Sequence, residues 1–261
     1  MSAPNAIHQT SIIHPKARLG TGVSVGAYSL IGEHVQIGDR SSIGPHVVVE
    51  GHTSLGRDNQ IFQFCSIGAA PQDKKYGDEP TRLEIGDRNT IREFCTLNRG
   101  TTQDGGVTNV GNDNWIMAYV HLAHDCQVGN NTIFANNAQL AGHVHVGDWA
   151  ILGGFTVVHQ FVRIGVHSIT AMGTILLQDL PPYVTASGNT AAPHGINSEG
   201  LKRRGFSTEA IAAIKRAYKS LYKAGNKLDD ARAAIESELS AHPELSSLVQ
   251  FLAVPGRGII R

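Results

Sequence analysis

The chain has 261 residues, which is enough for one large domain and a smaller one beside it. Lysine plus arginine and aspartate plus glutamate number 22 each, so the charge balance gives no reason to expect nucleic-acid binding. No apolar stretch approaches the length of a membrane span, no secretion signal opens the chain, and the three cysteines lack metal-ligand spacing. We therefore expect a cytoplasmic protein without a membrane span.

A six-residue repeat runs through the first two thirds of the chain. Large aliphatic residues recur at every sixth position over 7–67, return over 85–97, and continue one residue out of frame over 110–164. No α-helix has such a period, and 29 glycines with only 6% aromatic residues suit a turn-rich β structure. Three hexads would form one coil, so the pattern predicts a mainly β fold, a left-handed parallel β-helix of hexapeptide repeats.

Two further columns of the repeat support this fold. A small or β-branched residue follows each aliphatic one after four positions, so that the two together fill a narrow interior in layers. Cys65, Cys95 and Cys126 all occupy this small position, which predicts packing and not redox chemistry. Glycine often follows the aliphatic residue directly, where we expect its conformational freedom to help the chain turn a corner.

Two segments interrupt the repeat. Residues 69–84 put Asp73 and Glu79 where the hexad requires aliphatic side chains, and residues 98–109 contain a glycine pair. We expect both segments to leave the coil as loops. Long loops on a rigid scaffold often carry function, although an inert insertion is the alternative.

The repeat fades after Ile164, and from about residue 195 the apolar period becomes helical. Ser207 is the expected N-cap of a helix over 208–224 that ends before Gly225, and further helices are expected over 228–241 and 244–253. The prediction is a β-helix domain at 1–190 and an α-helical C-terminal domain at 191–261.

The coil length predicts which polar residues meet. Residues 18 apart should stack on neighbouring coils, at a strand spacing of roughly 4.8 Å. One edge of the prism would then collect His121, His124, Asp125, His143, His159 and Gln160. A single polar turn residue is usually only solvated, but a stacked group of histidines with a carboxylate favours a functional site. His145 is expected to lie outside this group, on the surface.

This edge favours acid–base chemistry. A neutral imidazole accepts a proton near neutral pH, and a neighbouring carboxylate such as Asp125 can fix its tautomer, although adjacency alone does not establish the contact. Gly142, stacked beside His124, could offer its backbone N–H to an oxyanion. No serine or cysteine occupies a comparable position, so the sequence favours direct base-assisted attack over a covalent enzyme intermediate.

Several motifs carry a resemblance to a known family. They are His121-Leu-Ala-His124-Asp125, Gly142-His143, His159-Gln160-Phe161, Pro181-Pro182-Tyr183 and the stretch 197–206. Together they resemble the UDP-N-acetylglucosamine O-acyltransferases of lipid A biosynthesis, over essentially the whole chain. The resemblance implies transfer of a 3-hydroxyacyl group from acyl carrier protein to the glucosamine 3-hydroxyl of UDP-N-acetylglucosamine, the first step of that pathway.

The same resemblance implies roles for particular residues. His124 would be the general base, Asp125 its partner and Gly142 the oxyanion donor. The positions that match the family's substrate-binding residues are Asp73, Lys75, His121, His143 and Gln160 for the sugar, with His159 lining the same cleft, and Asn197, Glu199 and Arg204 for the nucleotide, with Arg203 beside them. The resemblance implies no cofactor and no metal. It also implies a homotrimer with each active site between two prisms.

Two basic groups agree with these partners on chemical grounds. Lys202-Arg203-Arg204 supplies donors suited to a diphosphate, although such a cluster can simply face solvent. Lys215, Lys219, Lys223 and Lys227 form a stripe, joined by Arg216, that fits the docking of an acidic carrier protein.

Met172 departs from the pattern of family members that use longer acyl chains. Those members can carry glycine at the matching wall of the acyl groove. A thioether side chain there would shorten the groove. We expect a preference for shorter 3-hydroxyacyl chains.

Three other interpretations compete with this one. Another hexapeptide-repeat acyltransferase could use a different acyl donor or acceptor. A zinc enzyme similar to γ-class carbonic anhydrases could use histidines at the edge of the same fold. A non-catalytic scaffold would tolerate loss of His124.

Overall fold

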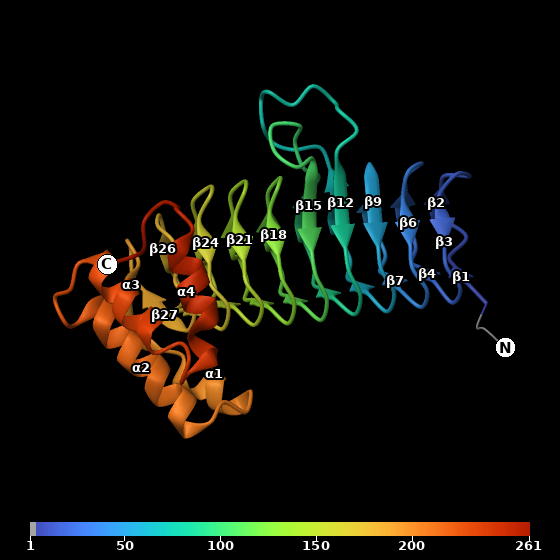
Figure 1. Cartoon of the computed structure of the whole chain (residues 1–261). Helices are drawn as coiled ribbons and strands as arrows, with labels where there is room; N and C mark the ends of the chain where they lie inside the picture. Colours follow the sequence, from blue (N-terminus) through green and yellow to red (C-terminus); the bar gives the residue numbers. More distant parts are fainter. Residues whose placement is uncertain (1–3) are drawn as a thin grey trace.

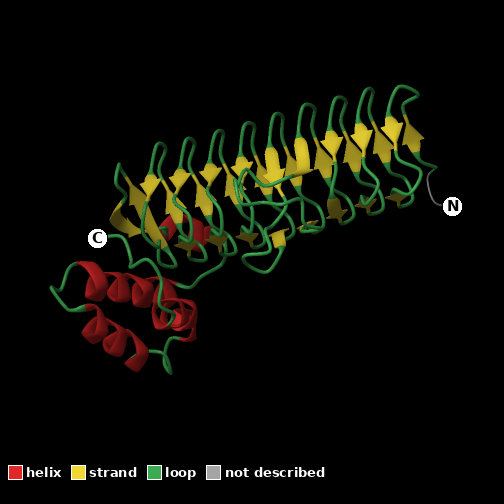
Figure 2. Ribbon diagram, turned by 90° about the horizontal axis from the view of Figure 1, so that it is seen from above, coloured by secondary structure: helices red, strands yellow, loops and turns green. Residues whose placement is uncertain are grey.

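The computed structural model describes residues 4–261, which form a long prism of short strands followed by a cluster of helices (Figures 1 and 2). Three parallel sheets make the faces of the prism. The first sheet contains β1 Ala6–Ile7, β4 Ser24–Val25, β7 Ser42–Ile43, β10 Gln60–Ile61, β13 Thr90–Ile91, β16 Trp115–Ile116, β19 Ile133–Phe134, β22 Ile151–Leu152, β25 Ile169–Thr170, β27 Val184–Ser187 and β28 Ala192–Ile196. The second sheet contains β2 Ile12–Ile13, β5 Leu30–Ile31, β8 Val48–Val49, β11 Ser66–Ala69, β14 Thr96–Asn98, β17 His121–Leu122, β20 Gln139–Leu140, β23 Val157–Val158 and β26 Ile175–Leu176. The third sheet contains β3 Arg18–Leu19, β6 Gln36–Ile37, β9 His52–Leu55, β12 Arg82–Ile85, β15 Val107–Val110, β18 Gln127–Val128, β21 His145–Val146 and β24 Arg163–Ile164.

The strand register follows the predicted coil length. Ala6 pairs with Ser24 and His121 with Gln139, each 18 residues further on. Because successive residues of a strand point to opposite faces, the second residue of most two-residue strands enters the core. Leu122 and Leu140 are fully buried in this way. The parallel β-helix of hexapeptide repeats is therefore confirmed.

The glycines that follow the aliphatic residues have a different role from the one expected. The dihedral φ is not positive at Gly26 or Gly38; it is positive two residues later, at Tyr28 (58°) and Arg40 (57°). A Cβ atom on Gly26 would instead lie 2.7 Å from a backbone carbon of the next coil, at Gly44. These glycines allow close approach of neighbouring coils, and the expectation that they make the turn was wrong.

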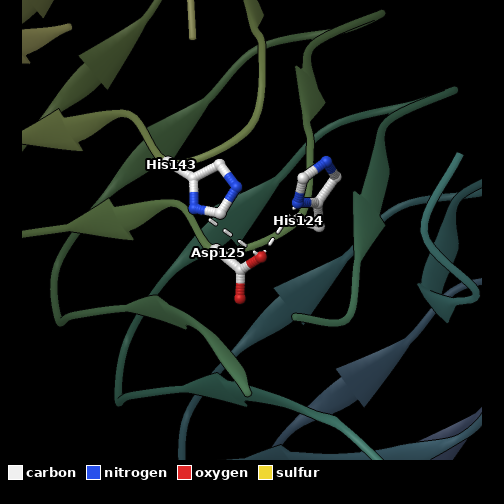
Figure 3. A group of neighbouring side chains, drawn as sticks. All are labelled: His124, Asp125 and His143. Carbon is white, nitrogen blue, oxygen red and sulfur yellow. Dashed lines mark hydrogen bonds and ion pairs between the residues drawn. The ribbon is translucent and has the colours of Figure 1, made fainter. Parts of the chain in front are cut away.

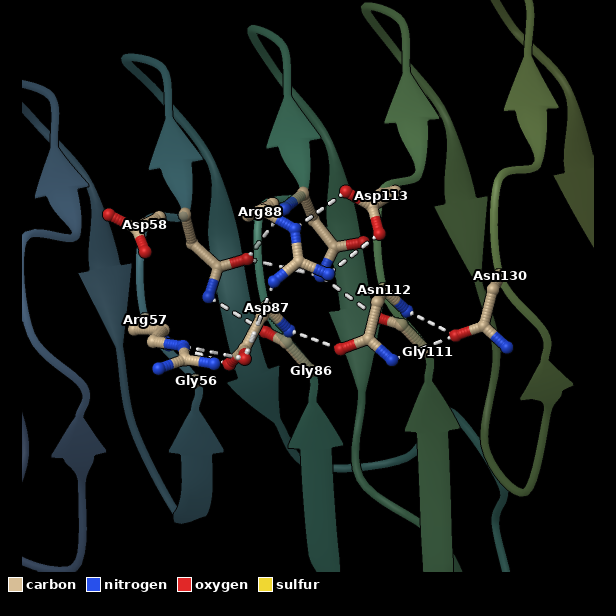
Figure 4. A network of polar contacts seen from close by, with 12 residues as sticks. Gly56, Arg57, Asp58, Gly86, Asp87, Arg88, Gly111, Asn112, Asp113 and Asn130 are labelled. Carbon is tan, nitrogen blue, oxygen red and sulfur yellow. Dashed lines mark hydrogen bonds and ion pairs between the residues drawn. The ribbon is translucent and has the colours of Figure 1, made fainter.

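One corner of the prism is held by a ladder of side chains, where the third sheet passes to the first (Figure 4). The Arg57 N–H donates to Asp87 Oδ1 (2.9 Å), the Asp87 N–H to Asn112 Oδ1 (2.8 Å), and the Asn112 N–H to Asn130 Oδ1 (2.8 Å). Asp148 continues the series by accepting from the Asn130 N–H. We call Asp87, Asn112, Asn130 and Asp148 the ladder. Each of its members satisfies a backbone donor of the preceding coil.

Both predicted loops leave the prism at another corner, where the second sheet passes to the third (Figure 1). Residues 70–81 connect β11 to β12, and residues 99–106 connect β14 to β15. They span less than the predicted 69–84 and 98–109, because the flanking strands extend into these ranges. Arg99, only 8% exposed, donates to the Gly68 carbonyl (2.7 Å) and the Tyr76 hydroxyl (2.9 Å), and so ties the first loop to the prism.

The three cysteines lie in the core. Cys65, Cys95 and Cys126 are buried and none forms a disulfide. Burial raises the pKa of the Cys126 thiol to about 12. The prediction that these side chains serve packing is confirmed.

The C-terminal part begins with β28, which pairs antiparallel with β27. It continues with α1 Ser198–Arg203, α2 Thr208–Tyr222, α3 Leu228–Ser237, the 3₁₀ helix η1 Pro243–Leu245 and α4 Ser246–Ala253. The predicted boundary after residue 190 lies in the β27–β28 turn, so β28 still belongs to a sheet of the prism. The division at this residue stays a prediction.

The helix bounds differ from the predicted ones at the later helices. Ser207 caps α2 as predicted, since its Oγ accepts from the Ala210 N–H (3.1 Å). The helix predicted over 228–241 corresponds to α3 and ends at Ser237. The helix predicted over 244–253 is split, because Pro243 starts a 3₁₀ turn before α4. No helix within residues 4–261 is long and apolar enough to cross a membrane.

Candidate functional site

The predicted column of histidines is present at the corner between the second and third sheets, one coil beyond the second loop. We call this the histidine corner, and its central residues are His124, Asp125, Gly142 and His143. The His143 N–H donates to the His124 carbonyl (3.0 Å), and the Phe161 N–H donates to the Gly142 carbonyl (3.1 Å). These bonds stack three successive turns on one another, as the 18-residue spacing predicts.

His124 contacts Asp125 directly (Figure 3). The Nδ1 atom of His124 lies 2.9 Å from Oδ2 of Asp125, which is 1% exposed. Thr101 in the second loop donates its N–H to Oδ1 (2.9 Å) and its hydroxyl to Oδ2 (2.7 Å). The contact that adjacency alone left open is therefore made, and the carboxylate is fixed from two sides.

The hydrogen bonds around Asp125 decide its charge. Burial opposes ionisation of this carboxyl, but donors from His124 and Thr101 outweigh it and hold the pKa of Asp125 below its usual value. Asp125 is therefore a carboxylate near neutral pH. It can hold the proton of His124 on Nδ1 and leave Nε2 as the acceptor.

Gly142 packs against the His124 ring. A Cβ atom at this position would lie 2.5 Å from Cε1 and 2.7 Å from Nε2 of His124, so any other residue would displace the ring. Within residues 4–261 the Gly142 N–H has no hydrogen-bond acceptor. Among the residues of this corner, Gly142 therefore presents an unused donor next to the imidazole.

His143 stands edge-on to His124, with ring centroids 5.0 Å apart and planes at 88°. Phe161 stacks on its face at 4.4 Å. Its Nδ1 atom is 2.8 Å from Oδ2 of Asp104, in the second loop, and 3.8 Å from Oδ2 of Asp125.

Among the described residues, no hydrogen bond joins His121, His159 or Gln160 to the central residues of the histidine corner. His121 on β17 bonds through Nδ1 to the Thr96 hydroxyl (2.7 Å), and burial lowers its pKa. His159 and Gln160 lie one coil further along, where Gln160 is exposed. His145 is exposed on β21, as expected.

Asp73 and Lys75 lie in the first loop. Oδ1 of Asp73 accepts from the backbone N–H of Lys75 (3.0 Å), which makes a tight turn, and the Lys75 side chain is exposed. Within one chain these side chains do not contact the histidine pair.

The four residues expected at the nucleotide end gather elsewhere, near the corner between the third and first sheets. Asn197 caps α1 and donates to the His167 carbonyl (2.9 Å), while Arg204 donates to the Trp149 carbonyl (3.2 Å). Glu199 pairs with Lys202, and Arg203 is exposed. A single chain therefore does not bring these residues to His124.

Met172 lies at the remaining corner, between β25 and β26, and is 78% exposed. It is separated from the histidine corner by the whole width of the second sheet. The expected acyl-groove residue and the expected base are thus on opposite edges of one face.

Three residues near these sites were missed by sequence reasoning. Thr101 and Asp104 reach the histidine corner from a loop that has no hexad register, so no spacing pointed to them.

His167, the third of these residues, stacks between Trp149 (6.3 Å) and Tyr183 (5.8 Å). Burial, and then the charge of Arg204, lower the pKa of His167 to about 4. The 18-residue step from Trp149 to His167 was a signal that could have placed it.

Ligand atoms of His124, Asp125 and His143 lie within 4.8 Å of one another, which is the spacing of a possible metal site. However, the two Asp125 oxygens already accept three donors, two from Thr101 and one from His124. The carboxylate is thus satisfied by the protein itself. The arrangement fits an acid–base pair better than a metal centre.

Two family models match the chain. The one described as UDP N-acetylglucosamine O-acyltransferase, domain 2, matches residues 179–260, and the bacterial transferase hexapeptide model matches residues 16–51 and 108–142. Among curated proteins, the acyl-[acyl-carrier-protein]–UDP-N-acetylglucosamine O-acyltransferase of Herminiimonas arsenicoxydans is 66% identical over 98% of this chain and 99% of its own length.

Solved structures agree with the sequence matches. LpxA of Acinetobacter baumannii is 46% identical with a TM-score of 0.96, over 98% of this chain and 99% of that one. The UDP-N-acetylglucosamine acyltransferase of Arabidopsis is 32% identical with a TM-score of 0.83, over 98% of this chain and all (100%) of that one. With these neighbours, the predicted left-handed β-helix with a small helical C-terminal part is confirmed.

Proposed function

Because this chain belongs to the family of acyl-[acyl-carrier-protein]–UDP-N-acetylglucosamine O-acyltransferases, we propose that it transfers a 3-hydroxyacyl group from acyl carrier protein to UDP-N-acetylglucosamine. The acceptor is the glucosamine 3-hydroxyl, in the first step of lipid A biosynthesis. The chain is thus an acyltransferase, and the chemistry of the step follows from the histidine corner. The observation that carries the proposal is the His124–Asp125 pair beside the unused Gly142 N–H.

His124 is the general base. Asp125 accepts a hydrogen bond from Nδ1–H of His124 and thereby leaves Nε2 free to take the proton of the sugar 3-hydroxyl. The hydroxyl oxygen then attacks the thioester carbonyl, a C–O bond forms, and the C–S bond breaks. The proton passes from His124 to the departing thiolate of the carrier protein. Asp125 stabilises the imidazolium that exists between these events.

Gly142 stabilises the oxyanion. The tetrahedral intermediate carries negative charge on the former carbonyl oxygen, which the Gly142 N–H can receive. The close packing of Gly142 on the imidazole keeps this donor next to the base.

The transfer is direct and has no covalent enzyme intermediate. The thiol nearest in sequence, Cys126, points into the core, where its Sγ donates to the Ala141 carbonyl (3.2 Å) and burial raises its pKa to about 12. The Thr101 hydroxyl is engaged by Asp125. Neither group supports nucleophilic attack on the thioester.

The complete site is formed by more than one copy of the chain, in a homotrimer. In one chain, His124, Met172 and Arg204 lie at three different corners of the prism. A site that uses all three requires corners of neighbouring prisms to face each other. In such a site the sugar contacts Asp73, Lys75, His121, His143, His159 and Gln160, and the nucleotide contacts Asn197, Glu199, Arg203 and Arg204.

The acidic carrier protein docks on α2. Lys215 and Lys219 on this helix and Lys223 at its C-cap are exposed, and Arg216 pairs with Glu238 and His242. Opposite charge accelerates encounter with an acidic partner. The acyl donor is a carrier-protein thioester, and the chain has three unpaired thiols, which persist in a reducing compartment. Both features support a cytoplasmic enzyme.

The test is turnover of UDP-N-acetylglucosamine against a series of 3-hydroxyacyl carrier proteins. The expected result is product formation by the wild type and a fall of roughly 10²–10⁴-fold for His124→Ala. His145→Ala, at an exposed histidine on β21, is the matched control and should retain activity. Activity that needs stoichiometric zinc and disappears on chelation would contradict the proposal in favour of the metal enzyme, and full activity of His124→Ala would contradict the role of the base.

A further inference from the structure

Asp104 lies in the second loop and reaches the histidine corner. Its Oδ2 atom is 2.8 Å from Nδ1 of His143, which is 39 residues away in sequence. Its other oxygen, Oδ1, accepts from the backbone N–H of Gly105 (2.9 Å). The carboxylate is therefore oriented by its own loop while it binds the ring of His143.

The same loop supplies the partners of both imidazoles. Thr101 fixes Asp125, which binds His124, and Asp104 binds His143. The base of the loop passes close to the prism at Gly100, where a Cβ atom would lie 2.7 Å from Oδ1 of Asp125. The loop thus fits the corner closely at one end and contacts His143 at the other.

The His143 ring is held by contacts from several directions. Phe161 covers one face, the edge of the ring meets His124, and Nδ1 faces Asp104 at 2.8 Å and Asp125 at 3.8 Å. His145, two residues further on, is a further titratable neighbour. Among residues 4–261 no hydrogen-bond partner engages Nε2 of His143 or Nε2 of His124.

We propose that Asp104 is a positioning residue that holds the proton of His143 on Nδ1 and so presents Nε2 of this ring as an acceptor for a sugar hydroxyl. This deepens the proposed function and rests on it, because His143 is there a sugar contact. Two carboxylates, Asp125 and Asp104, then fix two imidazoles in the same tautomer. The centroids of these two rings are 5.0 Å apart. Together the rings offer two acceptors to neighbouring hydroxyls of one sugar, of which His124 deprotonates one.

The test follows the tautomer of His143 by the imidazole ¹⁵N chemical shifts of the full-length protein labelled in histidine. The His143 signals are assigned by their loss in His143→Asn. In the wild type we expect protonated Nδ1 and unprotonated Nε2; in Asp104→Ala the proton should move largely to Nε2. The KM for UDP-N-acetylglucosamine should rise about tenfold, with kcat changed less.

Two further variants separate positioning from folding. Asp104→Asn keeps a carbonyl oxygen that can accept from Nδ1–H, so it should recover part of the tautomer and part of the KM. Gln103→Ala, an exposed neighbour in the same loop, should leave both unchanged. An Asp104→Ala protein that keeps the Nδ1–H tautomer, or that changes tautomer without any change in KM, overturns the proposal. So does an equal loss of thermal stability and activity in Asp104→Ala and Gln103→Ala.

The tautomer is read without turnover, so this result is distinct from that of the proposed function. If the wild type does not acylate UDP-N-acetylglucosamine, the proposed function fails whatever the His143 signals show. If it does, the variants decide the role of Asp104 alone.

Discussion

The histidine corner and the ladder are two edges of one prism with the same backbone geometry, and they use their side chains in opposite ways. In the ladder, the side chains of Asn112 and Asn130 accept hydrogen bonds from backbone N–H groups of the preceding coil. These side-chain oxygens are therefore engaged by the neighbouring coil. At the histidine corner, the partners of the side chains come from the second loop instead, as Thr101 binds Asp125. Among the residues that the structure describes, the His124 Nε2 atom and the Gly142 N–H have no hydrogen-bond partner. The groups to which we assign the reaction thus lie where side chains of successive coils do not form such a ladder with one another.

The largest difference between the two corners should appear when a carboxylate is neutralised. Asp125→Asn removes the charge that holds the His124 tautomer, and kcat should fall roughly 10²–10⁴-fold. Asp113→Asn, at the ladder corner, weakens only an exposed pair with Arg88 and should change kcat less than twofold. Steady-state kinetics of both variants provide the measurement. Equal changes in kcat would contradict the proposed difference between the two corners.

Glycine substitutions should sharpen the comparison. Gly142→Ala places a methyl group against the His124 ring, and a displaced base should lower kcat about 10²-fold with little loss of stability. Gly86→Ala collides with the backbone of Gly111 and with Asn112 of the ladder, so it should lower the free energy of unfolding by about 1–3 kcal/mol instead. Kinetics and denaturant unfolding of each variant distinguish the two outcomes. Loss of stability without loss of kcat in Gly142→Ala would argue against its place beside the base.

Substitution of Met172 tests whether the third corner of the prism lines the acyl groove. Met172→Gly should shift the preference toward longer 3-hydroxyacyl chains, because a groove without the thioether can bury additional methylenes. Each one is worth about 0.8 kcal/mol, or roughly fourfold in kcat/KM. Competition between carrier proteins of different acyl length measures the change. An unchanged preference would remove Met172 from the acyl groove.

A further prediction concerns how stability depends on pH through His167. Burial and the charge of Arg204 lower the pKa of His167 from 6.5 to about 4, so the unfolded chain binds this proton more readily than the folded one. The neutral ring thus contributes stability above pH 6.5, and this contribution is lost as the pH falls toward 4.

The size of this effect is limited because His167 is only partly buried. Between pH 7 and pH 5 we expect the free energy of unfolding to fall by an amount on the order of 1 kcal/mol. His167→Phe should reduce this fall. His194→Gln, exposed on β28, is the control. Denaturant unfolding at both pH values provides the measurement, and an identical pH dependence in the wild type and His167→Phe would contradict the assignment.

The sequence predicted the parts that depend on the repeat. The hexad specified the β-helix and its 18-residue coil, and the coil placed His124, Gly142 and Gln160 in one column. The contact between His124 and Asp125 depends on side-chain torsions and on Thr101, so the repeat could not establish it. Non-periodic segments were harder still, because a loop contact such as Asp104 with His143 has no spacing rule.

For two of the failed expectations the physical reason is identifiable from particular residues. Glycines such as Gly26 were assigned to the turn, but the close approach of the next coil requires them, and non-glycine residues such as Tyr28 adopt the positive φ. The third helix was predicted as one element, but Pro243 favours a short 3₁₀ turn that separates it from the preceding chain.

We propose that the histidine corner of one chain forms a working site only with a neighbouring copy that supplies Arg204. It is tested most directly by co-expression of His124→Ala and Arg204→Ala chains. Each variant alone should lose at least about tenfold in activity, whereas randomly mixed trimers should regain about one quarter of the wild-type activity, because a site with intact His124 from one chain and intact Arg204 from the next then forms by chance. Mixed assemblies that remain as inactive as the separate variants would contradict the account.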